Sequence, residues 1–148
     1  MAKIELHPDF KDFLRLLNSH EVRYILVGGY AVGYHGYPRP TADLDVWIAM
    51  TPENGKRLAN VLVDFGFGAE GLSGDEVTKA RQIIRMGLPP VRIEVLTTIS
   101  GVDFQPCYDN AVDGVIDGVQ VKIISRDDLR RNKRASGRHK DLDDLEHL

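Results

Sequence analysis

The apolar residues of the chain recur with two spacings, one typical of helices and one typical of strands. Near the start, Phe10, Phe13, Leu14 and Leu17 fall on one helical stripe, which predicts an amphipathic helix over 7–20. Short apolar or alternating runs between glycine, proline and aspartate residues predict strands. The predicted strands cover 24–27, 44–50, 82–86, 91–96, 112–116 and 119–124.

Three further helices are predicted from their first residues and apolar stripes. Thr51 followed by Pro52 is a helix start, because a capping residue precedes a proline at the first helical position. Ser125 predicts the start of a second helix, which Gly137 ends, and a last helix is predicted over 138–148. The stripes expected to be buried are Leu58, Val61, Leu62 and Phe65 in the first helix and Leu142, Leu145 and Leu148 in the last.

The segments between these elements carry turn signals of different strength. Asp117-Gly118, between two predicted strands, is the strongest hairpin signal in the chain. Residues 101–110, which include Cys107, are predicted to form a loop, and a short helix is predicted over 75–80. No internal repeat or low-complexity linker interrupts the sequence, so a single domain over 1–148 is expected.

Composition excludes some classes of protein. Apolar residues make up 43% and charged residues 28% of the 148 residues, as in ordinary soluble globular domains. No apolar run reaches the ~20 residues that span a bilayer, and the first residues lack the apolar core of a signal peptide. With its single cysteine, Cys107, the chain is expected in the reducing cytoplasm, without a membrane partner.

Charge is unevenly distributed along the chain. The net charge of −3 at pH 7 does not suggest general nucleic-acid binding. Residues 126–140, however, hold seven Lys or Arg against two Asp, so this segment carries +5 and the rest of the chain −8. Such a charge run is more often a solvated helix face, but its contrast with an acidic body makes it a candidate anion-binding segment.

Candidate site residues lie at both ends of the segment that connects the first two predicted strands. Gly28 and Gly29 offer backbone N–H groups that no side chain shields, which is typical of phosphate sites and also of ordinary turns. Asp43 and Asp45 open the next strand and project to one face, while Leu44 projects to the other. An isolated D-x-D is more often a solvated strand start, so the surrounding sequence decides whether it indicates a functional site.

That context follows a recognisable pattern. From Gly28 to Asp45 the sequence reads G-G-x-A-x-x-x-H-G-x-x-R-x-T-x-D-L-D. It resembles the nucleotidyltransferase superfamily typified by polymerase beta, and most nearly its small bacterial branch of AbiEii-type toxins and relatives. The ending K-x-A-x-G-R-x-K-D-x-x-D-L, from Lys133 to Leu145, resembles the ending of the same branch. The resemblance covers nearly the whole chain and implies an α+β, polymerase-beta-like fold, a mixed sheet with helices packed mainly on one face.

The resemblance also implies a metal site. Asp43 and Asp45 would bind divalent ions, and Glu94, on a later strand, would be the third carboxylate. Three carboxylates without a histidine suit Mg²⁺ better than zinc, and Mn²⁺ could take its place. Two such ions would activate an attacking hydroxyl and stabilise the leaving pyrophosphate.

Nucleotide-binding residues follow from the same resemblance. Gly28 and Gly29 would hold the triphosphate through their backbone, and Lys133 would point at it as a compact charge. Arg39 and Thr41 match the R-x-T that precedes the aspartates. Arg39 would either contact a phosphate or pack as a solvated surface residue.

We therefore expect a magnesium-dependent nucleotidyltransferase that moves a nucleoside monophosphate from a triphosphate, such as ATP, to an acceptor hydroxyl. Glu94 would accept the hydroxyl proton. The branch includes toxins that modify RNA or protein, some with an antitoxin partner, and enzymes that adenylylate antibiotics, so the acceptor stays open. The alternative is a non-catalytic module of the same fold that binds a nucleotide or a partner protein. Retention of all three acids favours an enzyme.

Overall fold

The structure is a computed structural model that describes residues 4–41, 43–66, 83–88 and 90–148. In chain order the elements are α1 (Pro8–Ser19), β1 (Tyr24–Val27), α2 (Gly28–Tyr34), β2 (Asp43–Ile48), α3 (Pro52–Asp64), β3 (Ile83–Leu88), β4 (Val91–Leu96), α5 (Phe104–Asn110), β5 (Val112–Ile116), β6 (Val119–Ile123), α6 (Arg126–Ser136) and α7 (His139–Glu146). The short helix predicted over 75–80, and Gln82 at the start of a predicted strand, lie outside the described residues.

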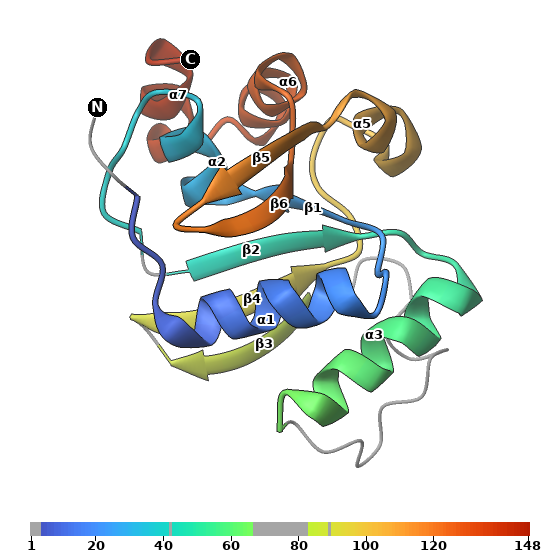
Figure 1. The fold of residues 1–148 in the computed structure, drawn as a ribbon. Helices are drawn as coiled ribbons and strands as arrows, with labels where there is room; N and C mark the ends of the chain where they lie inside the picture. The colour runs from blue at the N-terminus through green and yellow to red at the C-terminus, as the bar shows by residue number, and fades with distance from the viewer. Residues whose placement is uncertain (1–3, 42, 67–82, 89) are drawn as a thin grey trace.

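The described strands form one mixed sheet with the order β3-β4-β2-β1-β6-β5 (Figure 1). At its centre, β2 pairs antiparallel with β1 and parallel with β4, and β1 runs parallel to β6. The outer strands β3 and β5 are antiparallel to their neighbours. The predicted α+β fold with a mixed sheet is therefore confirmed, and it brings β2 and β4 together although Asp43 and its partner Arg92 lie 49 positions apart in sequence.

Alternation along β1 and β2 gives the sheet two different faces. Leu26 lies opposite Val46, and both are buried on the face that α1 covers, where Tyr24 donates a hydrogen bond to Asn18 of that helix. The stripe predicted for α1 supplies the other half of this core. Its four members, all buried, are Phe10, Phe13, Leu14 and Leu17.

Helices cover both faces of the sheet, which corrects the expectation that they pack mainly on one. Trp47, on the same face as the aspartates of β2, is 2% exposed, so this face also needs an apolar cover. Phe104 of α5 supplies it through an edge-on ring contact with Trp47 at a centroid distance of 5.2 Å. Figure 1 shows α1 and α3 on one side of the sheet and α5, α6 and α7 on the other.

Local sequence signals account for the helix starts and the hairpin. The Thr51 and Ser125 side chains each accept a hydrogen bond from a backbone N–H three residues ahead, as capping residues do. Asp117 and Gly118 both have positive φ, the backbone conformation of a tight two-residue hairpin turn between β5 and β6. These three predictions are confirmed.

Two predictions for the second half of the chain are wrong. Residues 101–110 are not all loop, because α5 forms there and buries Cys107. The last helix buries its leucine stripe only in part: Leu142 is 46% exposed and Leu148 is partly buried against the core, whereas Asp141 and Asp144 are 0% and 1% exposed. The reason is a set of ion pairs from other elements, described below, that holds these carboxylates inside.

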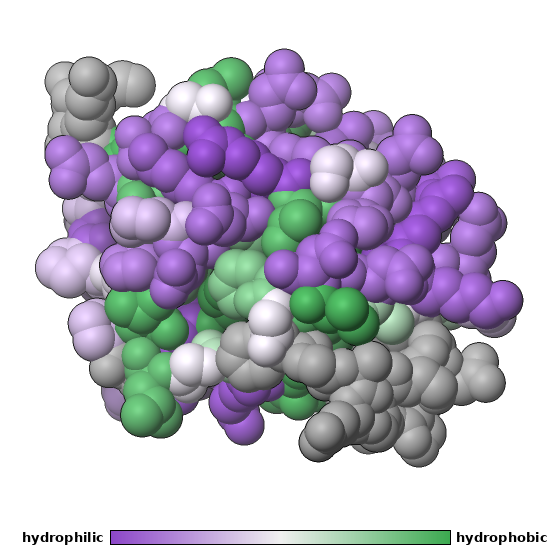
Figure 2. Space-filling model, turned by 60° about the horizontal axis from the view of Figure 1, so that its bottom comes forward, coloured by the Kyte–Doolittle hydropathy of each residue, from purple (hydrophilic) through white to green (hydrophobic). Residues whose placement is uncertain are grey.

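The outer surface is mostly hydrophilic on the face that Figure 2 brings forward, with apolar areas between the charged groups. Among the described residues, the large apolar side chains that are clearly exposed are Met50, Val63, Ile83, Leu88, Val115 and Leu142. Within the described part of the chain, every helix is too short or too polar to cross a bilayer.

Candidate functional site

Three carboxylates converge on one face of the sheet, as the sequence predicted. Asp43 and Asp45 project from β2 on the face opposite Leu44, which is fully buried. Parallel pairing of β2 with β4 places Glu94 directly beside Asp45 in the register. One oxygen from each of Asp43, Asp45 and Glu94 lies within 4.8 Å of the other two. Sequence alone predicted this grouping, and the strand register explains it.

Asp45 is the most constrained of the three acids. Burial, followed by the negative charges of Glu94 and Asp43, raises the pKa of Asp45 from 3.8 to about 7. Its Oδ1 is buried and has no hydrogen-bond partner among the described residues. A buried carboxylate oxygen without a partner costs free energy unless another group binds it, so the arrangement is poised for a cation.

The donor set fits a hard divalent cation. All three ligands are carboxylate oxygens, which Mg²⁺ and Mn²⁺ prefer to nitrogen or sulfur. The unpartnered Oδ1 of Asp45 gives such a cation a site that no protein group already fills. We conclude that Asp43, Asp45 and Glu94 can hold a metal ion.

Gly28 and Gly29 leave room for the acids and for their neighbour Thr41. A Cβ on Gly28 would lie 2.1 Å from Oδ2 of Asp45, and one on Gly29 would lie 2.5 Å from Oγ1 of Thr41. The glycine pair forms the first two residues of α2. A hollow of about 390 Å³ adjoins Gly29 and Thr41, with Tyr30 and Arg39 in its wall.

Replacing Gly28 with alanine tests this close approach. Its φ of +72° alone makes a side chain unfavourable, and the new Cβ would also push Asp45 out of the acid cluster. Gly118 is a matched control, because its φ is +81° and nothing lies within 4 Å of the added Cβ. We expect both variants to lose about 1–2 kcal/mol in urea denaturation and only Gly28→Ala to lose divalent-metal binding. Equal metal affinity in the two variants would contradict a close contact between Gly28 and Asp45.

Two arginines that the sequence analysis gave no role also contact the acids. Arg92 lies opposite Asp43 in the register and binds both of its oxygens, Nε to Oδ1 at 3.0 Å and Nη2 to Oδ2 at 2.8 Å. Arg85 of β3 lies 3.2 Å from Oε1 of Glu94. The signal was present in the sequence, because Arg92 and Glu94 are two residues apart on a strand and therefore share a face.

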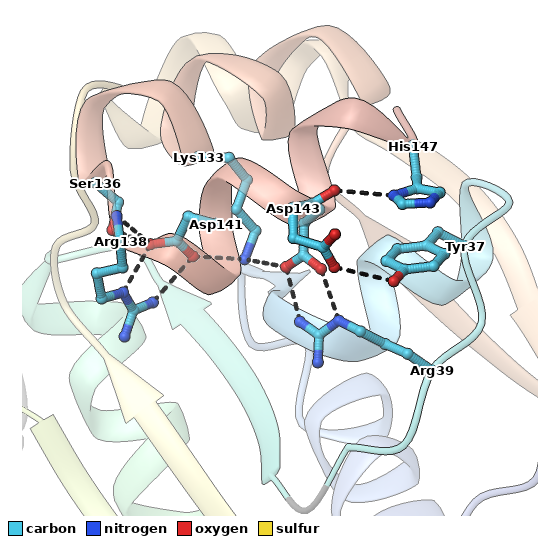
Figure 3. A network of polar contacts seen from close by, with 9 residues as sticks. Tyr37, Arg39, Lys133, Ser136, Arg138, Asp141, Asp143 and His147 are labelled. Atoms are coloured by element: carbon cyan, nitrogen blue, oxygen red, sulfur yellow. Dashed lines mark hydrogen bonds and ion pairs between the residues drawn. The ribbon is translucent and has the colours of Figure 1, made fainter.

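Lys133 and Arg39 lie in a buried ion network (Figure 3). Nζ of Lys133 lies 3.1 Å from Asp141 and 3.2 Å from Asp144, and these three side chains are at most 5% exposed. Arg39 binds both oxygens of Asp144, at 2.7 and 2.8 Å. The network ties the segment that leads into β2 to helices α6 and α7.

The same network holds the α6–α7 junction. Although burial alone would raise it, hydrogen bonds from Arg138, Ser136 and Lys133 keep the pKa of Asp141 below its ordinary range. Arg138 is held by Asp141 at 2.7 Å, yet its own side chain is 66% exposed. Figure 3 shows Arg138 and Lys133 meeting Asp141 from opposite sides.

Further basic groups that act on the acid cluster come from this junction. The positive charge of Lys140 lowers the pKa of Asp45, although burial and the other acids raise it overall. The charge of Asp45 in turn contributes to raising the pKa of Arg138, after the larger effect of the Asp141 hydrogen bond. Arg138 and Lys140 therefore lie within electrostatic reach of the acids and are both exposed.

Cys107 and two histidines stay outside this site. Burial, with Asp128 nearby, raises the pKa of Cys107 to about 12, so its thiol is unreactive at neutral pH. His35 is 2.7 Å from the backbone oxygen of Ile124, a structural contact, and His139 is exposed.

Comparisons with known proteins inform the fold. The sequence matches no protein-family model, and it matches no curated protein at a significant level. The structure is similar to the crystal structure of a "putative nucleotidyltransferase" from Thermotoga maritima, with a TM-score of 0.63 and 12% sequence identity. The match covers 96% of this chain and 93% of that one. The chain therefore shares the fold of that protein over nearly its whole length.

Proposed function

We propose that the protein is a metal-dependent nucleotidyltransferase that moves a nucleoside monophosphate from a nucleoside triphosphate to an acceptor hydroxyl. The observation that carries the proposal is the convergence of Asp43, Asp45 and Glu94 within 4.8 Å, beside a glycine whose missing side chain makes room for Asp45. The fold shared with the Thermotoga maritima protein supports it. The motif resemblance from Gly28 to Asp45 agrees with both.

Each acid has a role in this proposal. Asp43, Asp45 and Glu94 bind one or two Mg²⁺ ions, for which Mn²⁺ can substitute, through carboxylate oxygens. The bound metal supplies Lewis-acid chemistry, which lowers the pKa of a hydroxyl and stabilises charge on the leaving pyrophosphate. Glu94, on the strand nearer the sheet edge, accepts the proton of the acceptor hydroxyl.

The triphosphate lies against the glycine pair and the α6–α7 junction. Gly28 and Gly29 offer backbone N–H groups, and the hollow beside Gly29 has room for further parts of the nucleotide. We assign the phosphate charge chiefly to Arg138 and Lys140, because both are exposed and act electrostatically on Asp45.

The prediction of nucleotide binding also covers Arg39, Thr41 and Lys133, which differ in whether they can contact a nucleotide directly. Thr41 adjoins Gly29 and the hollow, so it can reach a nucleotide directly. The charges of Arg39 and Lys133 are already paired with buried carboxylates. We propose that these two act through the network, by holding the α6–α7 junction in place.

Position-specific labelling tests the reaction. Incubation with cell extract, Mg²⁺ and each nucleoside triphosphate labelled at the α-phosphate should transfer label to an acceptor, whereas γ-labelled nucleotide should not label it. The Asp43→Asn variant and EDTA should each abolish transfer, because a metal ligand or the metal is missing. Transfer of γ-label would indicate a kinase. Nucleotide binding without any transfer would favour the non-catalytic module.

The finer parts of the proposal rest on the sequence motifs. The K-x-A-x-G-R-x-K-D-x-x-D-L ending is similar to that of AbiEii-type toxins, which supports a cytoplasmic toxin with an antitoxin partner. An antibiotic adenylyltransferase uses the same chemistry on a different acceptor. A repressor-like gene next to this one would favour the toxin.

A further inference from the structure

The guanidinium of Arg92 spans two of the three acids. Besides its paired bonds to Asp43, its Nη2 lies 3.4 Å from Oε1 of Glu94. One nitrogen of Arg92 thus bridges the carboxylates of β2 and β4 that are proposed to share a metal ion.

The strand register explains why this contact forms. Arg92 is the cross-strand partner of Asp43, and Glu94 follows it on the same face of β4. Its side chain is 30% exposed, compared with 58% for Arg85, the other arginine at Glu94. The strand pairing therefore fixes Arg92 beside the acid cluster, whereas the more exposed Arg85 contacts Glu94 from the outer strand β3.

We propose that Arg92 is a resident counter-ion that competes with the divalent metal for Asp43 and Glu94, and that it exchanges these carboxylates for phosphate oxygens when a metal–triphosphate binds. This inference rests on the proposed function. Both oxygens of Asp43 accept hydrogen bonds from Arg92, so the guanidinium takes up part of this carboxylate and its positive charge opposes a metal ion that approaches the same group.

Competition of this kind couples metal binding to nucleotide binding. A metal ion alone displaces a guanidinium and leaves it without its carboxylate, which opposes binding. A triphosphate offers the displaced guanidinium bidentate hydrogen bonds of the same type, because phosphate oxygens, like carboxylate oxygens, match its geometry. The metal and the triphosphate should therefore each strengthen binding of the other.

A purely structural ion pair makes a different prediction. In that case, removing Arg92 would lower stability and would leave metal affinity unchanged or weaker, because the acids would be less well positioned. The sign of the change in metal affinity separates the two roles.

The test measures Mn²⁺ affinity by calorimetry for the full-length parent and Arg92→Gln, with and without a non-hydrolysable nucleoside triphosphate analogue. Without the analogue, we expect Arg92→Gln to bind Mn²⁺ about tenfold more tightly, a difference of about 1.4 kcal/mol. With the analogue, this advantage should disappear, because the variant lacks the phosphate contact. Arg85→Gln is the matched control, and its Mn²⁺ affinity should change less than about threefold.

Equal or weaker Mn²⁺ binding by Arg92→Gln would overturn the inference while leaving the proposed function intact. Failure of the parent and the variant to bind Mn²⁺ even with the analogue would overturn both. If Arg92→Gln does not fold, Arg92→Lys tests the inference in its place, because lysine keeps the positive charge and loses the bidentate hydrogen bonds to Asp43. It should bind Mn²⁺ alone more tightly than the parent, and unchanged affinity would again contradict competition.

Discussion

Replacing Asp45 with asparagine is expected to abolish nucleotidyl transfer while leaving the metal-free protein at least as stable as the parent. Asparagine keeps the shape of the side chain and removes a negative charge that burial and two neighbouring acids oppose. Changing a residue that only positions a metal ligand typically lowers metal affinity or activity about 10–100-fold. Loss of a ligand itself should therefore reduce the rate of transfer by more than this. Thermal melts and the labelling assay on both proteins measure the two effects.

The stability difference should depend on pH. An acid whose folded pKa is about 7 and whose ordinary pKa is 3.8 holds its proton in the folded chain over a range where the unfolded chain has lost it. Asp45 therefore makes the parent less stable as pH rises from about 4 to about 7, and Asp45→Asn lacks this loss. In EDTA, the melting temperature of the variant minus that of the parent should increase over this range.

An opposite pattern would indicate a structural acid. If Asp45 held a cap or an ion pair, asparagine would cost about 1–3 kcal/mol in the metal-free protein. A clearly destabilised variant that still gains the full stabilisation by Mg²⁺ and nucleotide would remove Asp45 from the metal site. A stability difference that stays constant with pH would show that the folded environment does not oppose its charge.

The acid cluster was predictable because it depends on local alternation and on a motif. Alternation alone puts Asp43 and Asp45 on one face, and the resemblance identified Glu94. Which strand lies beside β2 depends on parallel pairing over a long sequence separation, and no local pattern encodes that choice. Sequence spacing places Arg92 beside Glu94, but its contact with Asp43 becomes visible only with this register, since Asp43 lies on the other strand.

Helix α5 shows a different reason for failure. It has seven residues with Pro106 inside, and glycine and aspartate precede it, so its composition is that of a loop. Tertiary packing stabilises it, because Phe104 covers Trp47 and Cys107 is buried beneath the helix. Short helices of this kind are specified by the surface on which they pack more than by their own sequence.

The basic tail was assigned to solvent or to a ligand, and the structure gives part of it a third environment. Sequence patterns treat charged residues as exposed, since buried charges are rare without partners. Here Lys133 meets Asp141 eight residues later, and Arg39 meets Asp144 from 105 residues away. The second pairing cannot be deduced from spacing, so α7 was given the wrong buried face.

Lys133→Met is expected to lower the free energy of unfolding by roughly 3 kcal/mol, the lower end of the range for a broken buried ion pair. Methionine fills a similar volume but leaves Asp141 and Asp144, which are 0% and 1% exposed, with one cation fewer. The loss should stay near this lower end because Arg138 and Arg39 still pair with them. Urea denaturation measures it as a lower midpoint with an unchanged slope.

Arg134→Met is the matched control for this change. Arg134 is the next residue on α6 and is exposed, so the same substitution should alter stability by less than about 0.5 kcal/mol. At a temperature where Lys133→Met is folded, its affinity for Mg²⁺ and nucleotide should fall only modestly, because we assign the phosphate contact to Arg138 and Lys140. In the opposite result, Lys133→Met would be as stable as Arg134→Met and would lose nucleotide binding. That result would show that Lys133 contacts the triphosphate itself and that its ion pairs with Asp141 and Asp144 do not stabilise the fold.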